Sequence, residues 1–280
     1  MEVKTVLQRN AFRFKKQYGQ NFITDEGLLD RIVEAAGIDE NTTVVEIGPG
    51  AGTLTRAIAR RAKKVIAFEI DASLKPVLAE TLSDVPNAEV VFRDFMQVDL
   101  AEFERNMPPY TVIANIPYYI TTPLVMRFVE ESKRVERIVV TIQEEVARRF
   151  CAKENTADYG AVTAGIALRG RAFIAEHIPR TMFYPVPNVD SAVVRIDMEE
   201  GRIPVRSRKA YRETVKCAFG SRRKTLCNNL MTSFCLSREE ATAALSSIGV
   251  ESMARGESLS PEQLAKLSDV LADKLPALRE

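Results

Sequence analysis

The sequence predicts an α/β fold, in which a doubly wound and mainly parallel sheet is followed by a smaller helical domain. Segments patterned as strands alternate with segments of helical periodicity from about residue 26 to residue 150, which is typical of a parallel sheet with helices on both faces. The first strand runs into a turn that carries Gly48, Gly50 and Gly52. From about residue 207 onward, the apolar segments have helical spacing.

The apolar pattern and its punctuation define the individual elements. Strands are expected at residues 43–50, 64–70, 88–94, 110–116 and 137–143. Helices are expected before and between them, at residues 28–37, 54–62, 72–82 and 122–132. Residues 171–178 and 191–198 flank a proline-containing loop, so we expect them to form an antiparallel, hairpin-like pair.

The last part of the chain is expected to contain only helices, at residues 207–219, 222–234, 238–249 and 260–275. The start of the last helix is the clearest, because Ser260 is a preferred N-cap residue and Pro261 suits the first helical position. The change of pattern places a domain boundary near residues 198–206. We therefore expect one domain of residues 1–203 and a second of residues 204–280.

Composition excludes several classes of protein. The 280 residues are 46% hydrophobic, which is ample for a buried core. No run of about 18 apolar residues predicts a membrane span, and residues 1–20 lack the apolar centre of a secretory signal. The four cysteines show no CxxC spacing and His177 is the only histidine. These counts argue against a metal site and for a reducing, cytoplasmic compartment.

Positive charge gathers in two segments of a chain whose net charge is only +1. Residues 1–20 carry five basic side chains, among them Arg13, Lys15 and Lys16, against one acidic side chain. Residues 202–224 carry nine basic side chains against one and end in the run Arg222, Arg223 and Lys224. Such localised charge indicates a polyanion-binding surface, although a solvated helix face gives the same pattern.

The glycine turn and the acids near it indicate a nucleotide-like ligand. Gly48 and Gly50 let the backbone approach a ligand at the start of a helix. Glu46, which precedes them, would repel the diphosphate of a dinucleotide but suits a cationic ligand. Glu69 ends the next strand, where an acid can bind both ribose hydroxyls, and Asp94 ends the third, where it can accept from an adenine amino group. These acids resemble the pocket of class I methyltransferases that use S-adenosylmethionine; NAD binding or a merely structural loop are the alternatives.

Asn115-Ile116-Pro117-Tyr118 closes the fourth strand, where a methyltransferase of this class presents its acceptor. We expect the Asn115 side-chain oxygen and the Pro117 carbonyl to accept the two hydrogens of an adenine amino group. Those hydrogen bonds would direct the nitrogen lone pair towards the methyl donor without a strong general base. Tyr118 would stack on the base. Taken alone, each residue also has a structural explanation, as a turn former, a strand stop or a core side chain.

Five motifs in order resemble the bacterial small-subunit ribosomal RNA adenine dimethyltransferases, the KsgA family. They are "YGQNFI" (18–23), "VEIGPGAGTLT" (45–55), "NIPYYITTP" (115–123), "FYPVPNVDSAVV" (183–194) and "FGSRRKTLCNNL" (219–230). The resemblance covers essentially the whole chain and implies a Rossmann-like, seven-stranded sheet and a cytoplasmic, monomeric enzyme. The implied reaction is dimethylation of two adjacent adenosines in the 3′-terminal hairpin loop of 16S rRNA, within the 30S particle or its precursor.

The resemblance also assigns individual residues. Asn21 and Ile23 should contact S-adenosylmethionine with Gly48, Glu69, Asp94 and Asn115; Ile23 replaces the family's usual leucine. Phe183 should hold the target base against Tyr118. Arg222, Arg223 and Lys224, placed on a basic helix, should face RNA, as should Arg13, Lys15 and Lys16. Because helical neighbours lie about 100° apart, we expect one of the first three, with Arg223 as the candidate, to pair with an acid of the catalytic domain.

Two other functions remain open at this stage. The methyltransferases that modify large-subunit rRNA and confer macrolide resistance share the glycine turn and the Asn-x-Pro-Tyr motif. The motif at residues 219–230 and the long helical tail favour the small-subunit enzyme. A non-catalytic ribosome assembly factor on the same fold is the second alternative, and the complete set of pocket residues argues against it. An oxidoreductase that uses NAD is more distant.

Overall fold

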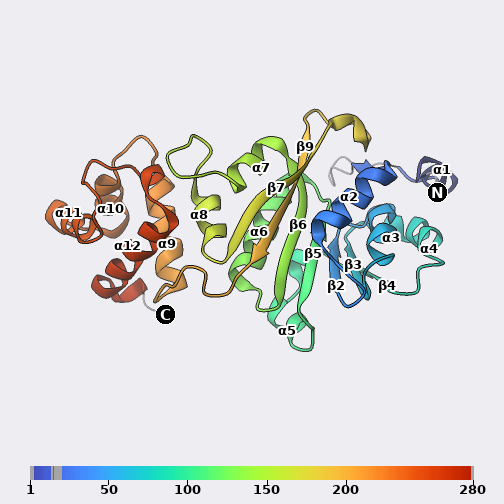
Figure 1. The fold of residues 1–280 in the computed structure, drawn as a ribbon, viewed down its shortest axis with the longest axis horizontal. Coiled ribbons are helices and arrows are strands. Elements are labelled where there is room, and N and C mark those ends of the chain that lie inside the picture. Colours follow the sequence, from blue (N-terminus) through green and yellow to red (C-terminus); the bar gives the residue numbers. More distant parts are fainter. Residues whose placement is uncertain (1–2, 14, 16–20, 279–280) are drawn as a thin grey trace. The chain divides into compact units, whose positions relative to one another are not determined.

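The computed structural model describes residues 3–13, 15 and 21–278, and the chain divides into two compact units (Figure 1). The first unit comprises Met1–Ala147 and Ala172–Met198, and the second comprises Arg148–Arg171 and Glu199–Glu280. The chain thus re-enters the second unit within the predicted boundary region. The sequence had placed residues 148–171 in the first domain. Instead, the Tyr159 hydroxyl donates to the Leu259 carbonyl and Ala164 belongs to the helical core.

One seven-stranded sheet forms the centre of the first unit, with the strand order β4-β3-β2-β5-β6-β9-β7 (Figure 1). The strands are β2 (Thr43–Ile47), β3 (Lys64–Glu69), β4 (Ala88–Phe92), β5 (Tyr110–Ala114), β6 (Val135–Gln143), β7 (Gly170–Ile178) and β9 (Ser191–Met198). The five strands from β4 to β6 pair in parallel, whereas β9 runs antiparallel to β6. The predicted mainly parallel, seven-stranded sheet is confirmed.

Helices cover both faces of this sheet. On one face α2 (Glu26–Ala36) and α3 (Thr53–Ala59) bury apolar side chains against Val44, Val65 and Ile113 of the strands. The other face carries α5 (Leu100–Glu104) and α6 (Tyr118–Glu131), where aromatic rings pack edge to face or stacked. The remaining helices of this part are α1 (Val3–Arg9), α4 (Lys75–Thr81) and α7 (Glu144–Phe150). Strand residues alternate between the two faces, which decides which side chains reach each core.

A second, two-stranded sheet was not predicted. The strand β1 (Phe22–Ile23) pairs antiparallel with β8 (Phe183–Tyr184), and Ile23 lies opposite Phe183. Two-residue strands are too short to produce a periodic apolar pattern. The segment at residues 21–23 lies beside the turn that contains Gly48 and Gly50. The Thr53 hydroxyl, just after this turn, donates to the Ile23 carbonyl over 3.1 Å.

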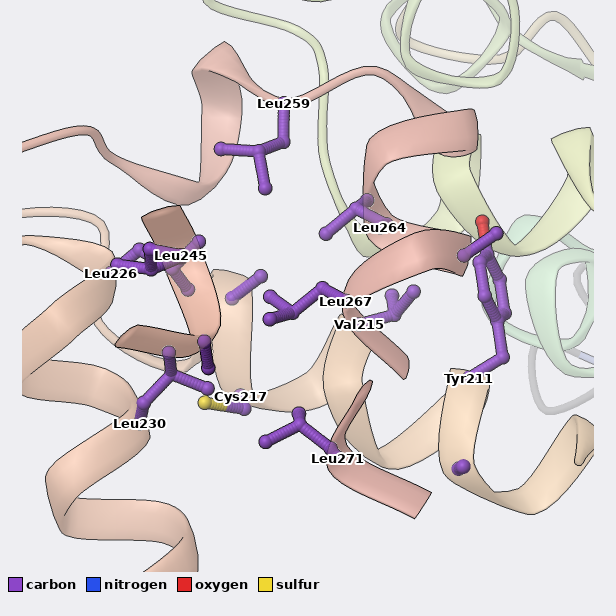
Figure 2. Packing of buried hydrophobic residues seen from close by; sticks show 14 of the residues in the cluster. Tyr211, Val215, Cys217, Leu226, Leu230, Leu245, Leu259, Leu264, Leu267 and Leu271 are labelled. Atoms are coloured by element: carbon purple, nitrogen blue, oxygen red, sulfur yellow. The ribbon is translucent and has the colours of Figure 1, made fainter. Parts of the chain in front are cut away.

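Helices build the second unit around its own apolar core. They are α8 (Ala161–Ala167), α9 (Arg208–Gly220), α10 (Leu226–Phe234), α11 (Arg238–Ser247) and α12 (Pro261–Lys274). Leucines of α12 and α10 meet Tyr211 and Val215 of α9 in this core, as Figure 2 shows. The predicted start of α12 is confirmed, because the Ser260 side chain accepts from the Gln263 N–H in a capping box.

The predicted helix at residues 222–234 is wrong at its beginning. Residues 221–224 form a turn, and α10 starts at Leu226 with Thr225 as its N-cap, accepting from the Asn228 N–H. A threonine side chain that caps the backbone competes with helix continuation. Arg222, Arg223 and Lys224 therefore lie in a turn and not on a helix. Among the residues described, no helix is long and apolar enough to cross a membrane.

Candidate active site

A cavity lies in the first unit, beyond the carboxyl ends of β2, β3, β4 and β5. Parallel α/β sheets bind ligands at this end of their strands. All residues predicted to bind the cofactor or the target base line the cavity, except Glu46. They are Asn21, Ile23, Gly48, Gly50, Glu69, Asp94, Asn115, Pro117, Tyr118 and Phe183. The fold thus brings together residues that are far apart in the sequence.

The glycine turn needs glycine because its neighbours come very close. Gly48 has a φ of 76°, and a Cβ added there would lie 2.8 Å from Cγ2 of Ile116. Gly50 has a φ of 57°, and an added Cβ would lie 2.6 Å from the Phe22 ring. Side chains essentially never occupy such positions. The turn is therefore fixed between the segment at residues 21–23 and the segment that follows β5.

Glu69 is the acid best placed in the cavity wall. It is 5% exposed, and each carboxylate oxygen accepts one backbone N–H, from Gly50 over 3.1 Å and from Asp71 over 2.8 Å. Burial raises the pKa of Glu69, while these two hydrogen bonds act in the opposite direction. Each oxygen retains a lone pair, so the carboxylate can accept two further hydrogen bonds, as a ribose diol would provide.

Asp94 lies two residues beyond β4 and is the N-cap of the short 3-10 helix at Phe95–Gln97. One carboxylate oxygen accepts from the Met96 N–H over 2.9 Å, and the other accepts from the Gln97 side-chain amide over 3.2 Å. These bonds hold the carboxylate at the edge of the cavity. Arg93 and the half-exposed Ile70 line the same end, although the sequence analysis did not select them.

Glu46 does not line the cavity, which corrects its predicted place. It precedes Ile47 on β2, and neighbouring strand residues point to opposite faces of a sheet. Ile47 reaches the cavity, whereas Glu46 lies on the face of Val44, beneath α2 and α3. Glu46 is fully buried beside the equally buried hydroxyl of Thr55. Burial raises the pKa of Glu46 to about 8, with a smaller contribution from Glu69, while the interaction of the carboxyl group with Thr55 lowers the pKa.

The amide of Asn115 is oriented by the backbone. Its side-chain N–H donates to the carbonyl of Asn21 over 3.1 Å. The side-chain oxygen is then the group left for a ligand, because no donor reaches it from the part of the chain that the structure describes. Asn115 follows the last residue of β5, so the strand fixes its backbone while residue 21 fixes its side chain.

The carbonyl of Pro117 is already occupied, which does not support its predicted role as an acceptor. Pro117 is the N-cap of α6, and its carbonyl accepts the N–H of Ile120 over 3.1 Å and the hydroxyl of Thr121 over 3.2 Å. A carbonyl oxygen has two lone pairs. The carbonyl of the preceding residue, Ile116, accepts no hydrogen bond from any described residue, and Ile116 lines the cavity.

Two aromatic side chains predicted to hold the base both line the cavity. Phe183, in β8, is 3% exposed. Tyr118 begins α6, and its hydroxyl lies 2.8 Å from the hydroxyl of Ser191, a residue that the sequence analysis missed. Burial raises the pKa of Tyr118, while the hydrogen bond with Ser191 acts in the opposite direction. Tyr119 is 69% exposed beside them.

The basic residues of the N-terminal arm have different surroundings. Arg13 is exposed. Lys15 lies 2.6 Å from the buried carboxylate of Asp71, in a salt bridge within the first unit. Asp71 in turn donates its N–H to Glu69, so Lys15 is linked to the cavity wall. Lys16 lies outside the described residues. The predicted contact of these residues with RNA stays a prediction.

The basic turn at residues 221–224 differs from its predicted arrangement. Arg222 donates to the carbonyls of Ala157, over 2.9 Å, and Tyr159, over 2.5 Å, within the second unit. The residue with a structural role is therefore Arg222 and not Arg223, and its acceptors are backbone carbonyls and not an acid. Arg223 and Lys224 are exposed. Once the predicted helix is replaced by a turn, the argument from helical faces no longer applies.

Comparisons with known proteins agree on one family. The model of the family described as ribosomal RNA adenine dimethylase matches residues 11–273. The protein named ribosomal RNA small subunit methyltransferase A of Geobacillus thermodenitrificans is 42% identical over 276 residues, covering 96% of this chain and 94% of its own. The protein of the same name from Streptococcus gordonii is 43% identical, covering 96% of this chain and 95% of its own.

Solved structures give the same picture of the fold. The 23S rRNA methyltransferase ErmE superposes with a TM-score of 0.70 at 31% identity, covering 90% of this chain and 99% of that chain. A dimethyladenosine transferase from Plasmodium falciparum superposes with a TM-score of 0.76 at 24% identity, covering 89% and 97%. At that lower identity the likeness shows the fold alone.

Proposed function

The chain belongs to the ribosomal RNA adenine dimethylase family, and from this premise we propose that it dimethylates two adjacent adenosines of 16S rRNA. The target nucleotides lie in the 3′-terminal hairpin loop, and the methyl donor is S-adenosylmethionine. One observation carries the assignment of the site: the Asn115 amide is held by the Asn21 carbonyl so that its oxygen is left for a substrate amine.

The comparisons favour the small subunit as substrate. Relatives named as small-subunit enzymes are 42% and 43% identical over nearly the full length of both chains. The large-subunit enzyme ErmE is 31% identical over a similar span, so modification of 23S rRNA is the second candidate function. The two candidates share the chemistry of the cavity and differ in the RNA that is bound.

The cavity suits S-adenosylmethionine. Glu69 would bind the ribose hydroxyls through its two remaining lone pairs, and Asp94 would accept from the adenine amino group. The hydrogen bonds that hold both carboxylates support these roles. Asn21, Ile23, Gly48 and Gly50 complete the wall. When bound, S-adenosylmethionine would supply a methyl group attached to a positively charged sulfur. As the amine nitrogen forms a bond to this methyl group, the sulfur would leave with the electrons of the broken S–C bond. Glu46 contributes to the core beneath the turn and not to this wall.

The residues after β5 orient the target amine. The Asn115 oxygen accepts one amino hydrogen, and the carbonyl of Ile116, in place of that of Pro117, accepts the other. Both acceptors draw the nitrogen away from the planar geometry in which its lone pair is delocalised into the ring, and this positioning supplies much of the rate enhancement. Tyr118 and Phe183 hold the base between them. The excess proton leaves to water, and no side chain is needed as a strong base.

The same proposal extends to the compartment, the oligomeric state and the substrate particle. We place the enzyme in the cytoplasm, acting as a monomer on the 30S particle or its precursor during small-subunit biogenesis. Residues 1–203, without residues 148–171, would act as the catalytic part. Residues 204–280, together with residues 148–171, would act as the RNA-binding part. Arg223, Lys224 and Arg13 are the candidates for phosphate contacts, whereas Arg222 and Lys15 have partners within the protein.

The test combines labelled S-adenosylmethionine with unmethylated small and large ribosomal subunits, followed by mapping of the modified nucleotides. The wild-type protein should dimethylate two adjacent adenosines of 16S rRNA only. Asn115→Ala should lower turnover by about 100-fold or more, because the amine is no longer oriented. Its RNA affinity should be nearly unchanged, and its affinity for S-adenosylmethionine is measured alongside.

The matched control is Asn41→Ala, which removes an exposed asparagine outside the cavity. That variant should behave as wild type. Label in 23S rRNA would favour the second candidate function, and RNA binding without any methyl transfer would favour the assembly factor. Near-normal methylation by Asn115→Ala would overturn the proposed orientation of the amine.

A further inference from the structure

The hydroxyl of Tyr118, an aromatic residue of the cavity wall, contacts the hydroxyl of Ser191 in the central sheet. The oxygens lie 2.8 Å apart, and either can donate. Ser191 is completely buried at the beginning of β9, whereas Tyr118 is partly exposed to the cavity at the beginning of α6. The two residues are separated by 73 positions in the sequence, so no local pattern predicts their meeting.

The backbone around Ser191 is firmly held. Ser191 pairs with Gln143 in the antiparallel ladder between β9 and β6. The ladder continues by one residue beyond the strand, because the Glu144 N–H donates to the Asp190 carbonyl over 3.1 Å. The Asp190 side chain also accepts the N–H of Arg180 over 2.9 Å. Ser191 therefore presents its hydroxyl from a fixed point of the sheet.

The same connection carries Phe183, the other aromatic residue predicted to hold the base. Phe183 lies between β7 and β9, in the segment that begins near Arg180 and ends at Ser191. It pairs through β8 with Ile23, which fixes it independently of Tyr118. Phe183 is thus part of this connection, and the hydroxyl of Tyr118 is attached to it through the hydrogen bond to Ser191.

We propose that Ser191 is a positioning residue that fixes the ring of Tyr118 parallel to a base held against Phe183. The inference rests on the proposed function, since it concerns how that site grips its target adenine. A tyrosine ring without this bond can rotate about its side-chain torsions, and a base that stacks on it is then presented to the methyl donor at varying angles. Fast transfer requires the amine of the bound base and the methyl donor to be aligned within a narrow range of angles. Loss of the hydrogen bond between Tyr118 and Ser191 should therefore lower kcat and leave RNA binding unchanged.

The experiment is a double-mutant cycle on methylation of unmethylated small subunits. Ser191→Ala and Tyr118→Phe each remove one hydroxyl and leave the stacking ring in place. Each should lower kcat by about threefold to tenfold, the effect of losing one hydrogen bond, with KM changed by less than about twofold. Because both variants remove the same interaction, the double variant should be no slower than the slower single variant.

Ser132→Ala is the matched control. Ser132 is equally buried in the first unit, but its hydroxyl bonds to Glu104 and it does not line the cavity. It should lower the melting temperature and leave kcat unchanged, so a general loss of stability is separated from misalignment. Tyr118→Phe keeps the test decisive even where Ser191→Ala fails to fold, because Tyr118 is partly exposed whereas Ser191 is completely buried.

The outcomes separate the two claims. A wild-type enzyme that transfers no methyl groups to adenosine removes the proposed function, and this inference with it. A working wild type combined with unchanged kcat in Ser191→Ala or Tyr118→Phe overturns this inference alone. Effects of the two single variants that multiply in the double variant also overturn it, because the hydroxyls would then act separately. A rise in KM for RNA without a change in kcat would assign the pair to binding and likewise overturn it.

Discussion

The cavity of the first unit and the helix starts of the second unit depend on interactions of very different range. In the first unit, the groups that form the cavity come from distant parts of the chain: Asn21 and Asn115 are 94 residues apart, and Tyr118 and Ser191 are 73 apart. In the second unit, helix starts are fixed within three residues, as in Ser260 and Gln263. The helix starts of the second unit are therefore specified by local sequence, although its core also joins distant segments, such as Tyr159 and Leu259, which are 100 residues apart. The cavity, in contrast, depends on the complete sheet.

Charge differs between the units in a related way. Many cations of the second unit have acidic partners nearby, including Arg206 with Asp273, Arg208 with Glu200 and Lys216 with Glu213. The strongly basic segment at residues 202–224 therefore carries fewer unpaired positive charges than its composition suggests. In the first unit, by contrast, Glu46 and Glu69 are buried without an ion-pair partner among the described residues. Counting charges along the sequence overstates the unpaired positive charge on the surface of the second unit. It also misses the buried acids of the first unit.

The largest expected effect concerns the buried acid of the first unit. Because the pKa of Glu46 is raised from 4.5 to about 8, the folded protein binds a proton that the unfolded chain releases between these pH values. The free energy of unfolding should therefore fall as pH rises from about 4.5 to about 8, by an amount on the order of 5 kcal/mol, at about 1.4 kcal/mol per tenfold change in proton affinity. Denaturant unfolding measured across this range should show a flatter profile for Glu46→Gln. A Gln variant with the same pH dependence as wild type would contradict this assignment.

The next effect is on the cofactor wall, which depends on long-range interactions. Glu69→Ala should weaken binding of S-adenosylmethionine by about 1.5–3 kcal/mol, the range for losing hydrogen bonds to a charged group. Calorimetry on the purified protein measures it. Glu89→Ala, which removes an exposed acid of the neighbouring strand β4, serves as the control. Equal affinities of Glu69→Ala and wild type would show that the ribose acid has been misplaced.

A smaller effect tests whether a helix start of the second unit is specified by local sequence. Ser260→Ala removes the cap of α12 and should lower the free energy of unfolding by about 1 kcal/mol, the usual cost of losing an N-cap. Ser260→Asp, which keeps an acceptor for the Gln263 N–H, should recover most of the stability. Affinity for S-adenosylmethionine should stay unchanged in both variants. A cap variant that altered cofactor affinity would contradict the assignment of Ser260 to the stability of α12 alone.

The smallest effect concerns the exposed cations of the turn. Arg223→Ala/Lys224→Ala should weaken binding to the small subunit and make its salt dependence shallower, by about 0.7–0.9 in the logarithmic slope for each phosphate that is no longer neutralised. Base choice should not change, since phosphate contacts carry no sequence information. Arg222→Ala should instead lower stability, because the carbonyls of Ala157 and Tyr159 lose their donor. An unchanged salt slope in the double variant would place the RNA surface elsewhere.

Sequence reasoning succeeded where the signal is local and periodic. The alternation of strands and helices, the glycine turn, and the acids that end β3 and β4 were predicted, and Glu69 and Asp94 line the cavity. Glu46 was misplaced because β2 is buried on both faces. Without alternation of polar and apolar residues, its pattern does not reveal which face each side chain takes. The carbonyl of Pro117 was misjudged because the helix was expected to begin later, at residue 122.

Other features could not be predicted because they arise from the meeting of distant segments. The strands β1 and β8 form by pairing with each other in a two-stranded sheet. The hydrogen bond between Tyr118 and Ser191 depends on the pairing of β9 with β6. The turn at residues 221–224 is a different kind of error, since Thr225 can both continue and cap a helix. Its spacing to Asn228 was visible in the sequence but was outweighed by the apolar periodicity of the residues after it.

The pairing of β1 with β8 has a consequence for the order in which the protein matures. It joins Phe22 to Tyr184, so one side of the cavity cannot close until nearly the whole of the first unit has been synthesised. Pairings between such distant positions carry a high entropic cost and form late in folding. The helix α2, capped by Asp25, can form from its own sequence well before that point. A newly made chain would therefore gain much of its secondary structure first and its competence for chemistry last.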